Sequence, residues 1–432
     1  MKHRLVAAFI GTALLAAACG GDGDEQSGGG SERQPGESIE LTLWSWVPGI
    51  QDAVDLWNEE NPDVQINLEE ISGDAYAKMY AALEAGNAPD LAQVEYEMLP
   101  GFRLNDGLEE LGQYGADEYE DKFVEWQWQQ GVFGDGVYAI PQASGPMAMY
   151  YRADLFEKWG IEVPTTWEAY EQAARTVREQ DAYITTFSPA STGWFTGLAW
   201  QSGSNWFGLD GDSWTVDMTN PESERVTDYW DGLIDDDLVD TKPDFSTGWY
   251  RDLQEGKVVT YLGASWADAI LKDNAPGTAG KWRVAMMPQW DESDPAAGNF
   301  GGSSTALLKG ADYPEEAIDF AVWLNTDPDS VALLSEGGYG WPAAEMEFEG
   351  SPLDREDPFF GGQNYNEVFA EADQMVDKDW TWIPTFGETA DGMSDGFKQA
   401  VESDGSLTDV LADLESTTIE DLEGKGLTVD GS

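Results

Sequence analysis

Histidine and cysteine are nearly missing from this chain. Among 432 residues there is one histidine, His3, and one cysteine, Cys19. A Ser-His-Asp triad, a Cys-His pair and a zinc site of the His/Cys kind each need more than these two side chains supply. The scarcity excludes these three kinds of site, and it leaves carboxylate chemistry and oxygen-ligand metal sites open.

Basic residues are also scarce. Lys and Arg total 22 against 83 Asp and Glu, which gives a formal net charge of −61. Nucleic acid is therefore not expected as a partner, because phosphate binding needs basic patches. No GxxxxGK[ST] or GxGxxG motif indicates a nucleotide site. We interpret the acidic excess as a solvated surface that repels itself, so we expect salt to raise the stability of the protein.

Long apolar runs are absent after residue 18. The first 18 residues join a basic start, Lys2 and Arg4, to an apolar run from Leu5 to Ala18. That run is too short to span a bilayer and is typical of a secretory signal peptide. Residues 19–38 are rich in Gly, Ser and Asp, so they are expected to form a flexible tether.

The residues around Cys19 resemble the lipobox of bacterial lipoproteins. The usual pattern has Leu three residues before the cysteine, whereas here Ala16 takes that place and Leu15 is one residue further back. The resemblance implies that acyl chains on Cys19 hold the protein at the outer face of the cell membrane. An ordinary signal peptide with an incidental cysteine is the alternative.

The chain is long and rich in tryptophan. After the signal about 414 residues remain, which is too many for one compact core, so we expect two lobes. There are 20 tryptophans. Most should lie in the core, but an exposed indole also offers a flat apolar face and an N–H donor, which suits the binding of sugars.

Strand and helix patterns alternate at the start of the body. Period-two apolar residues predict strands at 39–43, 64–68 and 89–94, and helical spacing predicts helices at 50–60 and 76–85. This order predicts an α/β fold with an open, mostly parallel sheet.

Aromatic and acidic side chains follow two of these strands. Trp44 and Trp46 come at the end of the first strand, and Glu95 and Tyr96 come at the end of the third. Ligands of open α/β sheets bind beyond the carboxyl ends of the strands. These four residues are therefore candidates for one binding site.

Further motifs occur in an order that resembles family 1 extracellular solute-binding proteins of bacterial ABC importers, the maltose-binding-protein-like family. The resemblance extends over roughly residues 40–345. The matching segments are LTLWS at 41–45, WNEENPD at 57–63, APDL at 88–91, YYRADLF at 150–156, VPTTW at 163–167, GKV at 256–258, GASW at 263–266 and GGS at 301–303.

The resemblance implies a two-lobed periplasmic-binding-protein-like fold, with a ligand cleft between the lobes and a hinge that the chain crosses more than once. The first lobe is expected at 39–146, with 301–335 returning to it, and the second at 147–300 with 336–424. Crossings are expected near 145–150, 300–304 and 334–339.

The resemblance also implies a function. It predicts that the protein binds a sugar, most often a di- or oligosaccharide, and hands it to the permease subunits of an importer. The protein would work as a monomer, without cofactor, metal or catalysis. The implied ligand-binding residues are Trp46, Glu95 and Tyr96 on the first lobe, Trp194, Trp266 and Trp341 on the second, and Gly302 and Ser303 in the hinge, with Trp44 added from the strand end.

Two other functions stay open. A secreted glycan-active enzyme would need a pair of carboxylates, which 83 acidic residues cannot exclude. A binder of a non-sugar solute is the second. The acidic segment 209–213 lacks the twelve-residue order of a calcium loop and is expected to be a turn. Residues 188–214 are expected to lie outside the core, because they are polar and rich in glycine.

Overall fold

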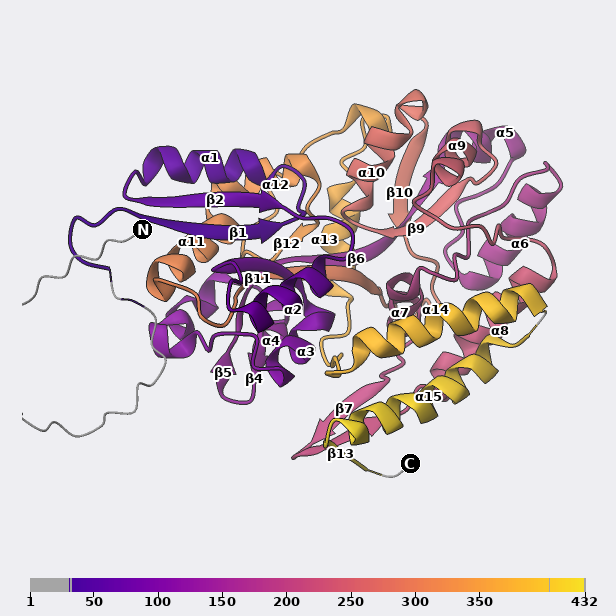
Figure 1. Ribbon diagram of the computed structural model, residues 1–432. Coiled ribbons are helices and arrows are strands. Elements are labelled where there is room, and N and C mark those ends of the chain that lie inside the picture. Colours follow the sequence, from indigo (N-terminus) through magenta and orange to yellow (C-terminus); the bar gives the residue numbers. More distant parts are fainter. Residues whose placement is uncertain (1–30, 32, 404, 431–432) are drawn as a thin grey trace, which may run out of the picture.

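The computed structural model describes residue 31 and residues 33–403 and 405–430 of the chain. Two α/β lobes lie at opposite ends of an elongated molecule (Figure 1). One eight-stranded sheet extends through both, in the order β10-β6-β11-β3-β1-β2, with β9 and β12 also paired to β6. The α/β fold class expected from the sequence is confirmed. The expectation of a mostly parallel sheet is wrong, because among the described strands of this sheet only the pairings of β1 with β2 and β3 are parallel, whereas those of β6 and β11 are antiparallel.

Three parallel strands begin the sheet of the first lobe. In β1 (Ile39–Ser45) every second residue is buried, and the strand pairs with both β2 (Val64–Glu70) and β3 (Leu91–Glu95). The helices α1 (Ile50–Glu60) and α2 (Ala75–Ala85) connect them. The β-α-β-α-β segment predicted from periodicity is confirmed, and β1 and β3 end at the residues expected to face a ligand.

Later segments complete the first lobe. The α1 residue Trp57 packs edge-on against Phe320 and at a tilt against Trp323, with ring centroids 5.3 and 5.2 Å away. Both partners lie about 260 residues further along the chain, so the lobe is discontinuous in sequence. Its remaining elements are α3 (Leu99–Leu104), α4 (Glu125–Gln130), β4 (Val132–Phe133), β5 (Gly136–Val137), α11 (Pro314–Thr326) and α12 (Pro328–Gly337).

One long strand belongs to both lobes. The first half of β6 (Ala139–Arg152) pairs antiparallel with β11 (Asn299–Leu307) in the first lobe. Its second half pairs antiparallel with β9 (Thr260–Ala264) and β10 (Trp282–Met286) in the second lobe. The β6–β11 pairing shifts register on both sides of Gly302 and Ser303. The backbone is therefore irregular where the lobes meet.

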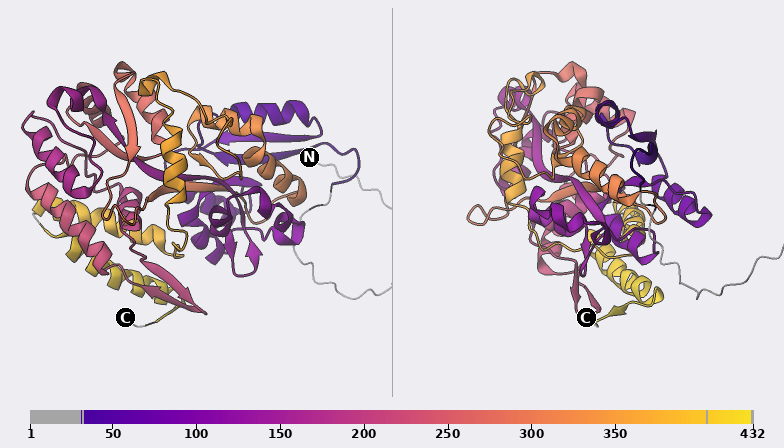
Figure 2. Two further views of the ribbon diagram at one scale, coloured as in Figure 1. Left: turned by 180° about the vertical axis from the view of Figure 1, so that it is seen from behind. Right: turned by 90° about the vertical axis from the view of Figure 1, so that its left-hand side faces the viewer.

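Helices cover both faces of the second-lobe sheet. The long helices α14 and α15 form an antiparallel pair along its lower side, which is yellow in Figures 1 and 2. The elements of this lobe are α5 (Ala153–Trp159), α6 (Trp167–Arg178), α7 (Thr192–Gln201), β7 (Phe207–Asp210), β8 (Ser213–Val216), α8 (Pro221–Asp235), α9 (Thr247–Glu255), α10 (Ala267–Asn274), α13 (Asn366–Gln374), α14 (Phe386–Ser403), α15 (Leu407–Gly424) and β13 (Thr428–Val429).

The expectation that residues 188–214 lie outside the core is wrong for residues 194–201, whereas residues 209–212 of the β7–β8 hairpin are exposed. Helix α7 is buried along most of its length. Its glycines explain this, since a Cβ on Gly197 would lie 2.5 Å from the sulfur of Met147, and one on Gly193 would lie 3.0 Å from the ring of Phe300. The glycines that suggested an open loop allow the helix to pack closely against the sheet.

The third passage between the lobes comes later than expected. The strand β12 (Trp341–Pro342) pairs with Ser144 and Ala143 of β6, and the amide of Val124 donates to the carbonyl of Ala343. Residues 341–345 therefore pair with the first lobe, although the boundary at 336 assigned them to the second. The physical reason is that β12 completes the hydrogen bonding of the edge of β6 opposite β11.

Candidate functional site

A cavity of about 420 Å³ lies between the lobes. The first lobe contributes Trp46, which follows β1, and Glu95, the last residue of β3. The second lobe contributes Trp266 and the adjoining face of α10, and the hinge contributes residues 301–303 of β11. Residues far apart in the sequence thus meet at one cavity, and two of the four strand-end candidates, Trp46 and Glu95, line it.

Trp266 is held firmly at the edge of this cavity. It connects β9 to α10 and is half-buried. Its Nε1 donates a 3.0 Å hydrogen bond to the carbonyl of Phe300, and the two rings meet edge-to-face with centroids 4.9 Å apart. Because the N–H is already used, the ring offers mainly carbon surface to a ligand.

Hydrogen bonds join the Trp46 backbone to the hinge. Gln93 Oε1 accepts from the amide of Trp46 at 3.0 Å, and Gln93 Nε2 donates to Ser303 Oγ at 3.4 Å. The Ser303 hydroxyl then donates to Gln142 Oε1 of β6 at 3.0 Å. This network positions the backbone after β1 relative to both hinge strands.

Glu95 supplies a carboxylate to the same cavity. Burial raises its pKa, whereas a hydrogen bond from the Tyr76 hydroxyl to Oε2, at 2.7 Å, lowers it. The Tyr76 ring in turn meets Trp46 edge-on at 5.7 Å. A second carboxylate, Asp273, lies on the opposite wall, and none of the described lining residues is Lys or Arg. The cavity suits a ligand that donates hydrogen bonds and carries no negative charge.

A close contact beneath the cavity explains a glycine. Gly302 has φ +110°, and a Cβ there would lie 3.1 Å from the ring of Tyr96. Tyr96 itself is buried, 3% exposed, below this strand and does not line the cavity. It therefore supports the hinge strand from below.

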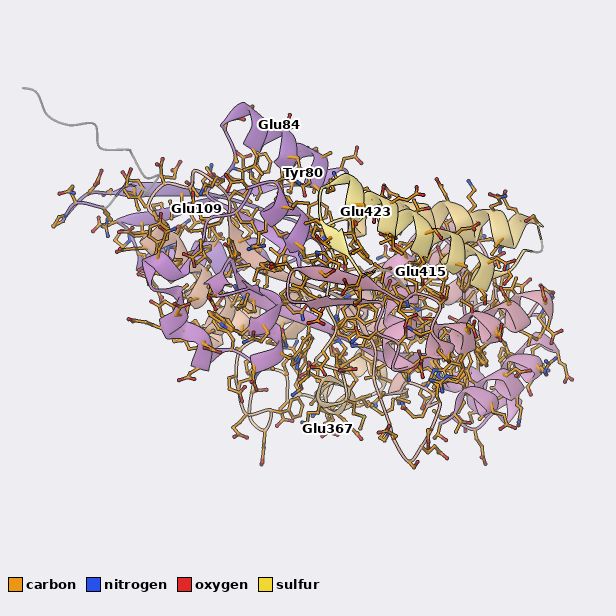
Figure 3. The ribbon with its side chains drawn as sticks, turned by 90° about the horizontal axis from the view of Figure 1, so that it is seen from below. Tyr80, Glu84, Glu109, Glu367, Glu415 and Glu423 are labelled. Carbon is orange, nitrogen blue, oxygen red and sulfur yellow. The ribbon has the colours of Figure 1, made fainter. Side chains whose placement is uncertain are left out.

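A larger groove, of about 730 Å³, separates the lobes on their lower side. In Figure 3, Tyr80 and Glu84 of α2 lie beside the end of α15 that carries Glu423. Carboxylates dominate the groove, although Lys309 and Lys425 also line it. The other acidic residues that line it are Glu97, Asp106, Glu388 and Asp391.

The family model for bacterial extracellular solute-binding proteins matches residues 44–330. This chain belongs to that family. Its members are binding proteins of ABC importers that work outside the cytoplasm, so the family expected from the sequence motifs is confirmed.

Relatives of this solute-binding protein include two named for sugars. An arabinooligosaccharide-binding protein of Halalkalibacterium halodurans is 28% identical over 308 residues, which cover 66% of this chain and 67% of the relative. A lactose-binding protein of Rhizobium radiobacter is 25% identical over 359 residues, covering 77% and 81%.

Solved structures of similar proteins agree with this family assignment. The galacto-N-biose-/lacto-N-biose I-binding protein from Bifidobacterium longum, in complex with lacto-N-biose, has a TM-score of 0.84 and 30% identity, and covers 91% of this chain and 100% of its own. A binding protein from B. animalis subsp. lactis in complex with β-1,6-galactobiose has a TM-score of 0.82 and 27% identity, with the same coverage.

Besides Tyr96, three tryptophans predicted for the site lie elsewhere in this solute-binding protein. Trp44 is half-buried on β1, and its Nε1 donates to Glu69 Oε2 of β2 at 2.9 Å. Trp194 is 3% exposed in the interior of the second lobe, and its Nε1 donates to the carbonyl of Leu262. Trp341 lines a different cavity, on the other edge of β6. The alternation of β1, the burial of α7 and the pairing of β12 explain these three corrections.

Sequence reasoning missed several residues of the inter-lobe cavity. Ile270 and Asp273 stand four and seven residues after Trp266, which is the spacing of one helix face, so they could have been found. Ser144 and Tyr339 come from hinge segments whose pairing no local pattern reveals.

Other expectations concern ions and the membrane. Residues 209–213 form the turn of the β7–β8 hairpin, with Gly211 at φ +62°, and no cluster of three or more possible metal ligands occurs among the described residues. No helix in the described part of the chain is long and apolar enough to cross a bilayer. Cys19, the signal and most of the tether lie outside the described residues.

Proposed function

We propose that this solute-binding protein captures an uncharged di- or oligosaccharide between its lobes and delivers it to the permease of an ABC importer. The observation that carries the proposal is the meeting of Trp266 from one lobe with Trp46 and Glu95 from the other in one cavity. A sugar presents C–H faces to indole rings and hydroxyl groups to carboxylates.

The size and charge of the cavity support this choice of ligand. Its volume of about 420 Å³ falls in the range typical of small-molecule sites. Asp273 would repel phosphorylated or acidic sugars, and the described lining offers no basic side chain to bind them. The relatives named for arabinooligosaccharide, lactose and lacto-N-biose provide the precedent for a neutral ligand of two or more rings.

Binding would stabilise the closed form because the ligand contacts both lobes. A ligand shifts the equilibrium between open and closed forms only by its difference in affinity for them. Trp266 and Glu95 lie on separate lobes, so together they contribute fully only when the cleft is closed. The permease could then distinguish loaded from empty protein by the angle between the lobes.

A thermal-shift screen tests the ligand class. Lactose, lacto-N-biose, galactobiose and arabinobiose should raise the melting temperature, because a ligand that binds only the folded state stabilises it by about 2.7 kcal/mol at a hundred times its Kd. Lactobionic acid, which carries a carboxylate, is the matched control and should give no shift. If acidic sugars shift the melting temperature and neutral ones do not, the proposed ligand class is wrong.

The alternative of a glycan-active enzyme is tested with the same sugars. We propose that the protein performs no chemistry, so prolonged incubation should return every oligosaccharide intact by chromatography. Release of any monosaccharide by the purified protein, with loss of this release in Glu95→Gln, would identify an enzyme.

We further propose that Cys19 carries the lipid that holds the protein at the membrane. Cys19→Ser removes the thiol, so the protein should appear in the medium with unchanged affinity for its sugar. Retention of this variant in salt-washed membranes would contradict the lipobox assignment.

A further inference from the structure

A second cavity, of about 440 Å³, lies behind the hinge. Residues 143 and 144 of β6 pair with β11 on one edge and with β12 on the other. The inter-lobe cavity adjoins β11, whereas this rear cavity adjoins Trp341 and Pro342 of β12. The hinge strand β6 therefore separates the two.

Aromatic side chains form one wall of the rear cavity. The half-buried ring of Trp341 stacks on Phe348, with centroids 6.3 Å apart and planes 23° from parallel. Trp126 of α4 also lines the cavity and is 3% exposed. Its buried Nε1 has no hydrogen-bond partner among the described residues. This N–H is enclosed by protein, so Trp126 offers ring carbons to the cavity rather than a donor.

The second lobe contributes polar groups to the same cavity. Asp373 of α13 accepts a 3.3 Å hydrogen bond from Ser144 Oγ through Oδ1, and Gln374 and Lys378 also line the space. Burial raises the pKa of Asp373 to about 6, while Ser144 and Lys378 lower it and Glu345 raises it further. At neutral pH this carboxylate remains mostly ionised and can accept hydrogen bonds.

The combination of groups decides which chemistry fits. The stacked rings of Trp341 and Phe348 favour a ligand with an apolar face, and Asp373 favours one with a donor. A third group, the ammonium of Lys378, favours a ligand with an acceptor. A sugar ring meets all three, because each hydroxyl both donates and accepts.

We propose that the rear cavity is a second carbohydrate site, which takes a compact sugar such as a monosaccharide. Trp341 stacks on the sugar ring, Lys378 donates to one hydroxyl, and Asp373 accepts from another. The inference does not depend on which solute the inter-lobe cavity takes.

Occupancy of this site affects the hinge. Trp126 belongs to the first lobe and Asp373 to the second, so a sugar that contacts both responds to the angle between the lobes. The two cavities lie on opposite edges of β6, so their occupants are coupled through one strand. By linkage, a sugar in one cavity changes the affinity of the other by the same factor in both directions.

The test uses the full chain with its inter-lobe cavity disabled by Trp266→Ala and Glu95→Ala. Saturation-transfer NMR and titration with D-galactose, and separately with D-glucose, should still detect binding of at least one sugar. Trp341→Ala in this background should weaken that binding at least tenfold. Lys378→Met keeps the aliphatic chain but removes the donor, and should weaken it several-fold. Trp44→Ala, which alters a half-buried indole outside both cavities, is the matched control and should leave it unchanged.

Two results would overturn the proposal. One is that the disabled protein binds neither monosaccharide, and the other is that Trp341→Ala binds them as before. Trp341→Phe keeps the stacking surface and should retain most of the affinity, which separates lost stacking from lost folding if the alanine variant melts early. If the disaccharide screen fails while Trp341-dependent binding persists, the proposed function is wrong and the rear site stands.

Discussion

Trp194 and Trp266 belong to the same lobe, yet they lie in opposite surroundings. The interior of the second lobe holds Trp194 edge-on against Trp230, with centroids 5.0 Å apart, and its N–H is bonded to Leu262. The rim of the inter-lobe cavity holds Trp266 half-buried, with its N–H bonded to the hinge strand. In both residues the indole N–H donates to a backbone carbonyl, so hydrogen bonding does not distinguish them.

The difference lies in what each ring leaves uncovered. Trp194 is 3% exposed and its ring meets Phe187 and Trp230 of α8, so its contacts are complete when the protein folds. Trp266 retains open surface toward the first lobe, so some of its contacts can form only with a bound molecule. A family motif that places a tryptophan in the second lobe therefore does not identify a ligand contact until burial is known.

The largest expected effect is the loss of stability when the buried ring of Trp194 is removed. Trp194→Ala should lower the free energy of unfolding by about 3–5 kcal/mol, because it removes a large buried side chain and leaves a cavity. The protein that remains folded should bind its ligand with near-native affinity. Denaturant unfolding monitored by circular dichroism measures the loss. If Trp194→Ala is as stable as the parent protein but binds ligand more weakly, Trp194 is a ligand-binding residue after all.

Trp266, at the rim of the cavity, should affect ligand binding rather than stability. Trp266→Ala should weaken ligand binding by about 2 kcal/mol, as for aromatic hot spots at interfaces, which is roughly thirtyfold in affinity. The melting temperature without ligand should change little. Calorimetric titration beside a melting curve separates the two effects, and Trp44→Ala serves as the control for loss of an indole outside the cavity. A collapsed melting temperature with native affinity would place Trp266 among the core residues.

A smaller effect is expected from a carboxyl group at the boundary between the lobes. Glu97 lies in the 3₁₀ turn after β3 (Tyr96–Met98) and lines the lower groove. Burial, and then the charge of Glu95, raise the pKa of Glu97 from 4.5 to about 8. The folded protein therefore holds a proton that the unfolded chain releases near pH 4.5. Its stability should fall as the pH rises from about 4.5 to about 8.

Glu97→Gln should remove part of that dependence on pH. The amide cannot ionise, so the variant should unfold with a shallower loss of stability between pH 5 and pH 8. Other carboxyl groups with a raised pKa, among them Glu95, Asp231 and Asp373, should account for what remains. The exposed Glu84 lines the same groove, and Glu84→Gln is the matched control. Equal pH dependence in Glu97→Gln and the parent protein would mean that Glu97 is ionised in the folded state.

The sequence predicted those parts of the site that follow directly from a strand. Trp46 and Glu95 were found because β1 and β3 show clear periodicity and both end at the cleft. Trp266 and Gly302 were found through short family motifs. The second-lobe helix α7 was missed because Gly193 and Gly197 resemble loop residues in sequence, while in the fold they allow close packing.

Residues positioned by pairing between distant segments could not be predicted. Ser144 reaches the cavity because β6 aligns with β11, more than 150 residues away. Trp341 was assigned to the cleft from its place in the sequence, but β12 adds to the far edge of β6 and carries it behind the hinge. Such register is set by the whole sheet rather than by any local pattern.

The position of β11 also governs when the protein can fold. β11 lies between β3 and β6 in the first-lobe sheet, although it is synthesised about 150 residues after β6 and about 200 after β3. An emerging chain thus exposes the open edges of β3 and β6 until residues 299–307 have left the ribosome. Chains generally fold domain by domain as they are made, and unpaired strand edges promote aggregation. For this chain the order of synthesis delays completion of the first lobe, which would keep a polypeptide destined for export unfolded for longer.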